Sequence, residues 1–270
     1  MKILHIITGL GRGGAESVLY RLCINDTKAK HIIISLSNNG DYVKLLKDHK
    51  IEVYCLEFKQ YKLKSIFKLF NLLKKIKPNI IQTWMYHSDL FGGLIAYLIG
   101  CKSIFWNIRH TTLLPEDSKK STLFVAKLSA RLSRIIPKRI ICCAEEAKRV
   151  HIDLGYEKRK MIVIANGYDI SLFKPCNKLR FSLRDELNLN SNTIVLGMVG
   201  RFHPQKNHIG LLKALSIVRK LDSDFKFLLI GRDLNYDNLI LSNEIKKQNL
   251  ESNILLLDQR ADIPSVMNAL

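Results

Sequence analysis

The sequence predicts an α/β protein in which parallel strands alternate with helices. Apolar runs such as residues 194–199 have the continuous hydrophobicity of strands that are buried on both faces of a sheet. Amphipathic runs with helical spacing follow them, as residues 209–221 do, and polar or glycine-rich loops join the two. At 270 residues, the chain is long enough for two domains of ordinary size.

The first part of the chain repeats this strand-then-helix order, which is typical of a parallel sheet covered by helices. We expect strands at residues 3–7, 31–36, 53–56, 80–84, 103–107, 139–143 and 161–164. We expect helices at residues 15–22, 42–46, 59–77, 90–98, 123–135 and 144–154.

The last part repeats the order on a smaller scale. We expect strands at residues 194–199, 227–230 and 254–257, and helices at residues 179–187, 209–221 and from residue 263 onward. Only about 80 residues follow Asn190, whereas a usual doubly wound domain has roughly 100 to 150. We therefore expect the second domain to be incomplete.

The charge of the chain points to an anionic partner. Its composition, 47% hydrophobic and 25% charged, is that of a globular protein, but the formal net charge is +19 and the pI is near 9.7. A nucleotide, nucleic acid or an anionic membrane surface would fit this charge. Nucleic acid is the weakest of the three, because the sequence has no zinc-ligand spacing, no RNP-like aromatic motif and no basic tail.

The cysteines and apolar segments indicate a cytoplasmic protein. The six cysteines form no CxxC pair, so we expect reduced, mostly buried thiols and no bound metal. The first residues are too short and polar for a signal peptide. The longest apolar segment, residues 90–101, is shorter than the roughly 20 residues of a spanning helix. We expect contact with a membrane only at its surface, on the inner face.

The basic stretch at residues 59–77 allows two interpretations. Its apolar residues recur at helical spacing and lysines fill the remaining positions. The helix can pack on the sheet with its lysines in water, or its polar face can also meet anionic lipid, worth about 1 kcal/mol per lysine. The two interpretations are compatible. The apolar positions are Leu63, Ile66, Phe67, Phe70, Leu73 and Ile76.

A glycine pattern follows the first strand. Gly9, Gly11 and Gly14 match GxGxxG, which on its own is weak evidence for a dinucleotide site. The confirming acid at the end of the second strand is absent, because that strand ends in Ser35-Leu36-Ser37-Asn38. An NAD-dependent oxidoreductase therefore remains an alternative that depends on the glycines alone.

The strongest motif is the octet Gly-Arg-Phe-His-Pro-Gln-Lys-Asn at residues 200–207. It lies between a predicted buried strand and a predicted helix, where ligands bind in open α/β sheets. The N-terminus of a helix offers unpaired N–H groups and the positive end of a dipole, and the octet adds Arg201 and Lys206. This combination predicts a phosphate site.

The octet resembles the nucleotide-binding loop of GT4 glycosyltransferases, which are retaining enzymes of the GT-B fold. The resemblance implies two Rossmann-like doubly wound domains facing a cleft, an acceptor-side domain at residues 1–168 and a partial nucleotide-sugar-binding domain at residues 169–270. It implies that Arg201 and Lys206 bind the donor's diphosphate and act in catalysis, with no metal cofactor.

Further positions follow from the same resemblance. Gly13-Gly14-Ala15-Glu16 looks like the family's Gly-Gly loop, which faces the donor phosphate and the acceptor. His110 directly follows a predicted strand, where related enzymes place a histidine against the donor sugar, and it can assist proton movement. Segments 83–93 and 106–112 resemble acceptor-side loops, and they contain Trp84, His87 and Arg109.

The resemblance extends into the second domain. Residues 166–175 resemble the segment with which the family crosses into that domain. Gly200, Gly231 and Arg260 are the further donor-binding positions that it implies. The family often carries glycine where Asp258 stands, and this departure weakens the prediction of base contacts at residues 258–260.

The implied reaction transfers a sugar from a nucleotide diphosphate sugar to a saccharide or lipid-linked saccharide, in cell-surface polysaccharide synthesis. The resemblance covers the whole chain but about two-thirds of the family's length, and the family's E-x7-E pair is absent from the sequence. The alternative is a truncated, non-catalytic relative that only binds nucleotide or a membrane surface. Binding of UDP or GDP without NAD would separate both from the oxidoreductase.

Overall fold

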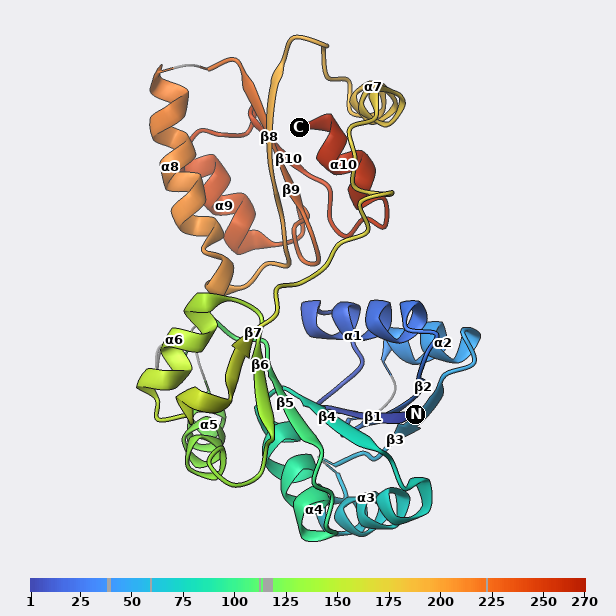
Figure 1. Ribbon diagram of the computed structural model, residues 1–270. Helices are drawn as coiled ribbons and strands as arrows, with labels where there is room; N and C mark the ends of the chain where they lie inside the picture. Colours follow the sequence, from blue (N-terminus) through green and yellow to red (C-terminus); the bar gives the residue numbers. More distant parts are fainter. Residues whose placement is uncertain (38–39, 59, 112, 114–118, 222) are drawn as a thin grey trace. The chain divides into compact units, whose positions relative to one another are not determined.

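The computed structural model describes residues 1–37, 40–58, 60–111, 113, 119–221 and 223–270 (Figure 1). Lys59 and Thr112, at the ends of two predicted segments, lie outside the described residues. The chain divides into two compact units, Met1–Gly167 (unit 1) and Tyr168–Leu270 (unit 2). The boundary predicted from the sequence lies one residue later.

Unit 1 contains a seven-stranded parallel sheet in the order β3-β2-β1-β4-β5-β6-β7. From β1 the chain builds outward to β2 and β3, and it then returns to place β4 on the other side of β1. The carboxyl ends of β1 and β4 are therefore the topological switch point of this sheet. The strands are β1 (Lys2–Ile7), β2 (Lys30–Ser35), β3 (Glu52–Cys55), β4 (Ile80–Trp84), β5 (Ile104–Ile108), β6 (Arg139–Cys142) and β7 (Met161–Val163).

Helices cover both faces of this sheet, because its buried strands are apolar on both sides (Figure 1). Ile6 and Ile34 pack in the core beneath α3, α5 and α6, whereas the neighbouring Ile7 and Ile33 pack with α1 and α2. This arrangement is doubly wound, as predicted. The helices are α1 (Gly14–Asn25), α2 (Asp41–Asp48), α3 (Lys62–Ile76), α4 (Gly93–Leu98), α5 (Lys120–Leu132) and α6 (Glu145–Asp153), with a 3-10 turn at Lys158–Lys160.

The helix predicted at residues 90–98 begins differently from the expectation. It starts as a π-helical turn, η1 (Ser88–Gly92), and continues as α4. The two glycines at the junction allow close packing, since a Cβ atom on Gly93 would lie 2.6 Å from Nε1 of Trp106. A Cβ atom on Gly92 would lie 2.9 Å from Cγ2 of Ile6.

Two predictions about burial were wrong. On α3, the buried face is formed by Ser65, Leu69, Leu73 and Ile76. Of the predicted apolar positions, Leu63 and Phe67 remain 74% and 68% exposed. The apolar stripe of this helix is thus wider than the face that the sheet covers. All six cysteines are free, but only Cys23 and Cys142 are buried, and the other four are half-buried.

Unit 2 contains a three-stranded parallel sheet in the order β10-β9-β8, which agrees with the prediction of a small sheet. Helices α8 and α9 lie on one face, and α7 and α10 lie on the other (Figure 1). The strands are β8 (Ile194–Val199), β9 (Phe225–Ile230) and β10 (Ile254–Leu256). The helices are α7 (Asn177–Glu186), α8 (His208–Leu221), α9 (Leu239–Lys247) and α10 (Ile263–Ala269), with a 3-10 turn at Pro204–Lys206.

None of the helices in the described ranges is both long enough and apolar enough to cross a membrane.

Candidate functional site

The predicted phosphate loop joins β8 to α8 at the carboxyl edge of the unit 2 sheet. Gly200 donates its N–H to the carbonyl oxygen of Ile230 at 2.7 Å, which continues the pairing of β8 with β9 for one more residue. The chain then forms the 3-10 turn Pro204–Lys206. Asn207 has a φ of 49°, and its Oδ1 accepts from the N–H of Gly210 at 3.2 Å, so it caps the start of α8.

Arg201 and Lys206 are the cations of this loop. Both are exposed, and no ion pair or hydrogen bond of their side chains is recorded among the described residues. The Lys206 side chain lies over Gly200, because its Cε would be 3.6 Å from a Cβ atom built there. Both charges are thus available beside the N-terminus of a 14-residue helix, where an anion is favoured.

Gly231 follows β9 and contacts the start of the same loop. Its φ of 147° lies in the region that favours glycine. A Cβ atom on Gly231 would collide with the carbonyl oxygen of Gly200 and would lie 2.5 Å from the carbonyl carbon. It would also lie 2.9 Å from the N of Arg201. Gly231 therefore lets two neighbouring loops approach each other at the predicted donor site.

The loop after β10 explains one departure from the family pattern. Asp258 has a φ of 47°, a conformation in which glycine has no steric penalty, and its carbonyl oxygen accepts from the N–H of Gly231 at 2.7 Å. A glycine at this position would adopt the same turn without strain. Asn235 lies within 3.4 Å of the Asp258 carboxylate.

Arg260 is already engaged by carboxylates. Its guanidinium donates to Asp262 from Nε and Nη2, both at 2.8 Å, and to Glu186 from Nη1 at 2.7 Å. These partners raise the pKa of Arg260, and Arg260 in turn holds the pKa of the Asp262 carboxyl below its usual range. In this structure, Arg260 joins the loop after β10 to α7, and donor binding by Arg260 stays a prediction.

In unit 1, the loops after β1 and β4 meet at the switch point. The hydroxyls of Thr8 and Ser88 lie 3.2 Å apart and link these two loops. Gly13 has an extended conformation before α1, and the side chain of Glu16 occupies the space beside its Cα. Gly14 is the first residue of α1, and nothing lies within 4 Å of a Cβ atom built on it. The predicted Gly-Gly loop is therefore at the ligand-binding edge of the sheet.

Three of the predicted acceptor-side residues lie at this same edge. Trp84, the last residue of β4, is fully buried, and Arg109 lies over its ring with Cζ 4.8 Å from the ring centroid. Arg109 donates from Nη1 to Oδ1 of Asn166 at 2.6 Å. His87 is half-buried in the loop after β4. Arg109 therefore covers the buried Trp84 ring. Acceptor contacts by these three residues stay predictions.

His110 follows β5 and is half-buried. Its Nδ1 is buried without a hydrogen-bond partner in the described part of the chain, and its ring stacks on Tyr86 with centroids 5.1 Å apart. Burial lowers the pKa of His110 below its ordinary value. The imidazole is therefore neutral at neutral pH, and it can both donate and accept hydrogen bonds with sugar hydroxyls.

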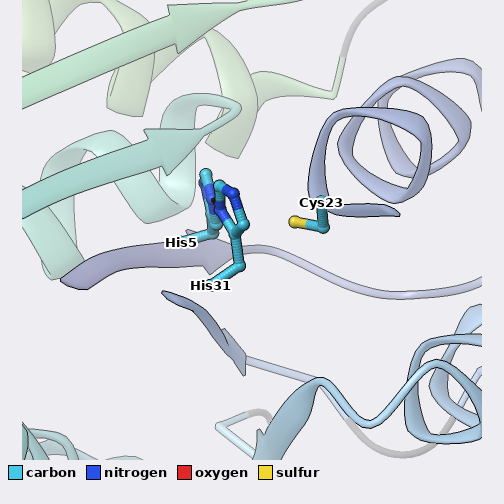
Figure 2. Close-up of side chains that lie close together, drawn as sticks. All are labelled: His5, Cys23 and His31. Atoms are coloured by element: carbon cyan, nitrogen blue, oxygen red, sulfur yellow. Dashed lines mark hydrogen bonds between the residues drawn. The ribbon is translucent and has the colours of Figure 1, made fainter. Parts of the chain in front are cut away.

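A cluster of side chains with the chemistry of metal ligands lies under β1 and β2. Figure 2 shows His5 and His31 side by side, with the Cys23 thiol nearby. Their ligating atoms lie within 4.8 Å of one another, which in the described ranges is the single group of three such residues. A metal ion would need a free lone pair on each of these side chains.

The hydrogen bonds of this cluster leave His5 without a free lone pair. The Trp84 indole N–H can only donate, so Nδ1 of His5, 3.2 Å away, accepts and the His5 proton lies on Nε2. That proton faces Nδ1 of His31 at 2.9 Å, and Nε2 of His31 lies 3.2 Å from the Asp26 carboxylate. Burial also raises the pKa of the Cys23 thiol to about 12. The cluster is a satisfied hydrogen-bond chain, and a metal there would break the Trp84 bond.

Several buried polar residues near the predicted sites were not predicted from the sequence. Tyr86 and His151 form a hydrogen bond across 65 residues of sequence. His208, the first residue of α8, is buried, and neither ring nitrogen has a hydrogen-bond partner in the described ranges. The carboxyl group of Asp89 is fully buried in η1, and burial raises its pKa well above the usual range. Only the polar character of the segment after β4 signalled any of these in the sequence.

Comparison with known proteins supports the family prediction. A family model described as Glycosyltransferase Family 4 matches residues 12–172, more than half of the chain. A second, described as Glycosyl transferases group 1, matches residues 180–270. The two matches fall on unit 1 and unit 2, apart from the first few residues of unit 2.

Two curated relatives show how far the similarity extends. The chain is 30% identical over 210 residues to an Escherichia coli protein named UDP-Gal:alpha-D-GlcNAc-diphosphoundecaprenol alpha-1,3-galactosyltransferase, covering 77% of this chain. The matched region spans about half, 54%, of that relative's length. The chain is 23% identical to the Staphylococcus aureus capsular polysaccharide biosynthesis glycosyltransferase CapH, covering 96% of this chain and 70% of CapH.

Solved structures resemble the whole chain. HepE from Anabaena, solved in complex with UDP-glucose, matches with a TM-score of 0.82 at 23% identity, over 100% of this chain and 72% of that chain. A glycosyltransferase from Rickettsia africae matches with a TM-score of 0.76 at 18% identity, over 99% of this chain and 70% of that one. The fold is therefore GT-B, as predicted. The family match and this fold together show that the chain belongs to Glycosyltransferase Family 4.

Proposed function

We propose that the protein transfers a sugar from a nucleotide diphosphate sugar to a saccharide or lipid-linked saccharide, with retention at the anomeric carbon, in the synthesis of a cell-surface polysaccharide. The observation that carries the proposal is the loop of residues 200–207, where Arg201 and Lys206 have no carboxylate partner recorded in the described ranges. Family membership and the activities for which the relatives are named support the reaction class.

The chemistry assigns a role to each cation. In the transfer, the bond between the anomeric carbon and the diphosphate oxygen breaks, the acceptor oxygen bonds to that carbon, and the hydroxyl proton passes to the departing diphosphate. Arg201 and Lys206 stabilise the negative charge that grows on this leaving group, each by about 1.5 to 3 kcal/mol. These contacts speed the step as well as bind the donor, and we infer that they replace a metal ion.

We assign sugar recognition in unit 1 to the loops after β4 and β5. The imidazole of His110 is neutral and has no hydrogen-bond partner in the described ranges, so it is the group best suited to pair with a sugar hydroxyl. The relatives give the first donors to test, because the E. coli relative is named for UDP-Gal and HepE was solved with UDP-glucose.

A kinetic experiment separates this function from a protein that only binds nucleotide. Release of UDP from UDP-galactose or UDP-glucose is followed with and without saccharide acceptors, for the wild type and for Arg201→Ala. We expect the variant to lower kcat more than it raises the donor KM, because the guanidinium acts mainly in the transition state. A change confined to KM would contradict that role. Nucleotide binding without any turnover would favour the non-catalytic alternative.

We further propose that α3 places the protein on the inner face of an anionic membrane. Leu63 and Phe67 lie one turn apart and are both largely exposed, and exposed Lys64 and Lys68 lie beside them. Apolar side chains flanked by lysines are typical of helices that lie in a lipid interface. The net charge of +19 favours an anionic surface. The lipid-linked acceptor in the name of the E. coli relative agrees with this location.

Vesicle flotation tests the membrane proposal. We expect binding to vesicles that contain phosphatidylglycerol and little binding to vesicles of phosphatidylcholine alone. Replacing both Leu63 and Phe67 with serine should lower the partition coefficient about tenfold or more. The matched control replaces Ile217 and Leu221 on α8, which are 63% and 86% exposed, with serine. Equal losses in both double variants would contradict a role specific to α3.

A further inference from the structure

His110 lies on a stack of rings that reaches from the carboxyl edge of the unit 1 sheet into its core. The planes of His110 and Tyr86 are inclined by 25°. Next to Tyr86 is His151, with ring centroids 5.6 Å apart, and Tyr156 meets His151 edge-on at 5.2 Å. Tyr86, His151 and Tyr156 are buried, whereas His110 is half-buried. His110 is thus the accessible end of the stack.

The hydrogen bonds within the stack have a fixed direction. Nδ1 of His151 is 2.6 Å from the carbonyl oxygen of Ala147, and since a carbonyl only accepts, the His151 proton lies on Nδ1. Nε2 of His151 is therefore the acceptor, and the Tyr86 hydroxyl donates to it at 2.6 Å. Burial lowers the pKa of His151 to about 4, so this neutral tautomer persists at neutral pH.

Three segments that are distant in sequence meet in this stack. Tyr86 follows β4, and the preceding Met85 has a φ of 71°, which turns the chain so that Tyr86 points into the core. His151 is on α6 and His110 follows β5. The Tyr86–His151 hydrogen bond therefore fixes the loop after β4 to α6, and the stacking contact extends this support to the loop after β5.

The orientation of His110 depends on this support. No hydrogen bond of its imidazole is recorded in the described part of the chain, so the ring is oriented by stacking on Tyr86. Packing alone would be served as well by apolar side chains, because a buried hydroxyl and imidazole cost free energy unless they pair. The hydrogen bond to His151 fixes the orientation of the Tyr86 ring, because the Tyr86 hydroxyl has a single acceptor.

We propose that Tyr86 and His151 are positioning residues for His110, which hold its imidazole in the orientation that meets a sugar hydroxyl. The proposal rests on the proposed function, because it takes the sugar of a nucleotide diphosphate sugar as the ligand of His110. Neither positioning residue touches the sugar. Replacing Tyr86 or His151 should therefore change only the part of the sugar affinity that His110 contributes.

The test compares the affinities of UDP-glucose, UDP-galactose and UDP for the full chain by calorimetry. UDP lacks the sugar, so the ratio of the UDP affinity to the UDP-sugar affinity isolates the sugar contact from general damage. We expect His110→Ala to lower UDP-sugar affinity about tenfold and to leave UDP affinity unchanged, as loss of one hydrogen bond would. We expect Tyr86→Phe, which removes one oxygen atom, to lower it about threefold.

Two substitutions at His151 provide a matched pair. In His151→Gln the amide oxygen can still accept from Tyr86, whereas in His151→Leu no acceptor remains. We expect the glutamine variant to resemble the wild type and the leucine variant to resemble Tyr86→Phe. In the His110→Ala background, Tyr86→Phe should have no further effect on the affinity ratio, because its contribution acts through His110.

The outcomes distinguish the two levels of the argument. If His110→Ala weakens UDP-sugar binding while Tyr86→Phe and His151→Leu leave the ratio unchanged, the positioning role is refuted and the proposed function stands. An additive loss in the double variant would also refute it. If neither UDP nor either UDP-sugar binds, the proposed function fails and this inference fails with it. Tyr86→Phe answers the question even if the leucine variant does not fold.

Discussion

Gly231→Ala tests whether the loop of residues 200–207, the predicted donor site, is built as the structure shows. Alanine is strained at a φ of 147°, and its Cβ would lie 2.5 Å from the carbonyl carbon of Gly200 and 2.9 Å from the N of Arg201. The obstacles are backbone atoms, which no change of side-chain rotamer can move away. A strained backbone conformation costs about 1 to 3 kcal/mol and overpacking costs a similar amount. We therefore expect the free energy of unfolding of unit 2 to fall by about 2 to 6 kcal/mol.

Urea unfolding can assign this loss to the correct unit. Both tryptophans of the chain, Trp84 and Trp106, are in unit 1, so tryptophan fluorescence reports on unit 1 and far-UV circular dichroism reports on both units. We expect the unit 2 transition seen by circular dichroism to move by about 1 to 2 M urea or more, while the fluorescence midpoint stays unchanged. UDP affinity should also fall, because the clash displaces Gly200 and Arg201.

Gly11→Ala is the matched control, because nothing lies within 4 Å of a Cβ atom built on Gly11. We expect its free energy of unfolding to stay within about 0.5 kcal/mol of the wild type. If Gly231→Ala is as stable as this control and binds UDP equally well, the close contact between Gly231 and Gly200 does not shape the site, and the reasoning is wrong.

Three further predictions concern titration, metal binding and an ion pair. The pKa of His151 is lowered to about 4 in the folded protein, so the unfolded state binds more protons between about pH 6.5 and 4, and unit 1 should lose stability as pH falls through that window. At pH 4.5, this residue lowers the free energy of unfolding by about 2 to 3 kcal/mol, and His151→Gln should abolish that effect. If the wild type and His151→Gln show the same dependence of stability on pH by fluorescence, the assignment is wrong. Zinc and EDTA should leave the unfolding midpoint of unit 1 unchanged, and nitrogen-15 NMR should show His5 protonated on Nε2. Stabilisation of unit 1 by zinc would instead show that the cluster in Figure 2 binds metal. Arg260→Ala should lower the free energy of unfolding of unit 2 by about 1 to 2 kcal/mol, because Asp262 and Glu186 lose their cationic partner. If stability is unchanged and UDP binding is weakened, Arg260 instead contacts the donor.

The elements were predictable wherever hydrophobic patterning was unambiguous. The strand β8 has the predicted bounds, Ile194–Val199, because a short, continuous apolar run bounded by polar loops has few alternatives. The strand and helix that flank the loop of residues 200–207 were also predictable, as β8 and α8, whereas phosphate binding by this loop stays a prediction. Helix α3 was predicted, but its buried face was not, since its apolar residues outnumber the positions that the sheet covers.

Other features depend on contacts that a linear pattern does not contain. The Tyr86–His151 pair and the chain from Trp84 through His5 to His31 join residues that become neighbours only when the strand order is known. Arg260 carries the charge expected of a donor contact, but Glu186, 74 residues away, accepts from it. Sequence spacing therefore predicts which loops could form the site, while the tertiary structure decides which of their side chains remain available for a ligand.

Calorimetry with UDP, UDP-glucose and NAD tests the central claim most directly, namely that the loop of residues 200–207 binds the diphosphate of a nucleotide. We predict that UDP and UDP-glucose bind and NAD does not, and that Arg201→Ala and Lys206→Ala each weaken UDP binding about tenfold or more. Lys220→Ala, which removes the same charge at the other end of α8, should leave UDP affinity unchanged. The claim is contradicted if UDP does not bind, or if it binds equally well to all three variants.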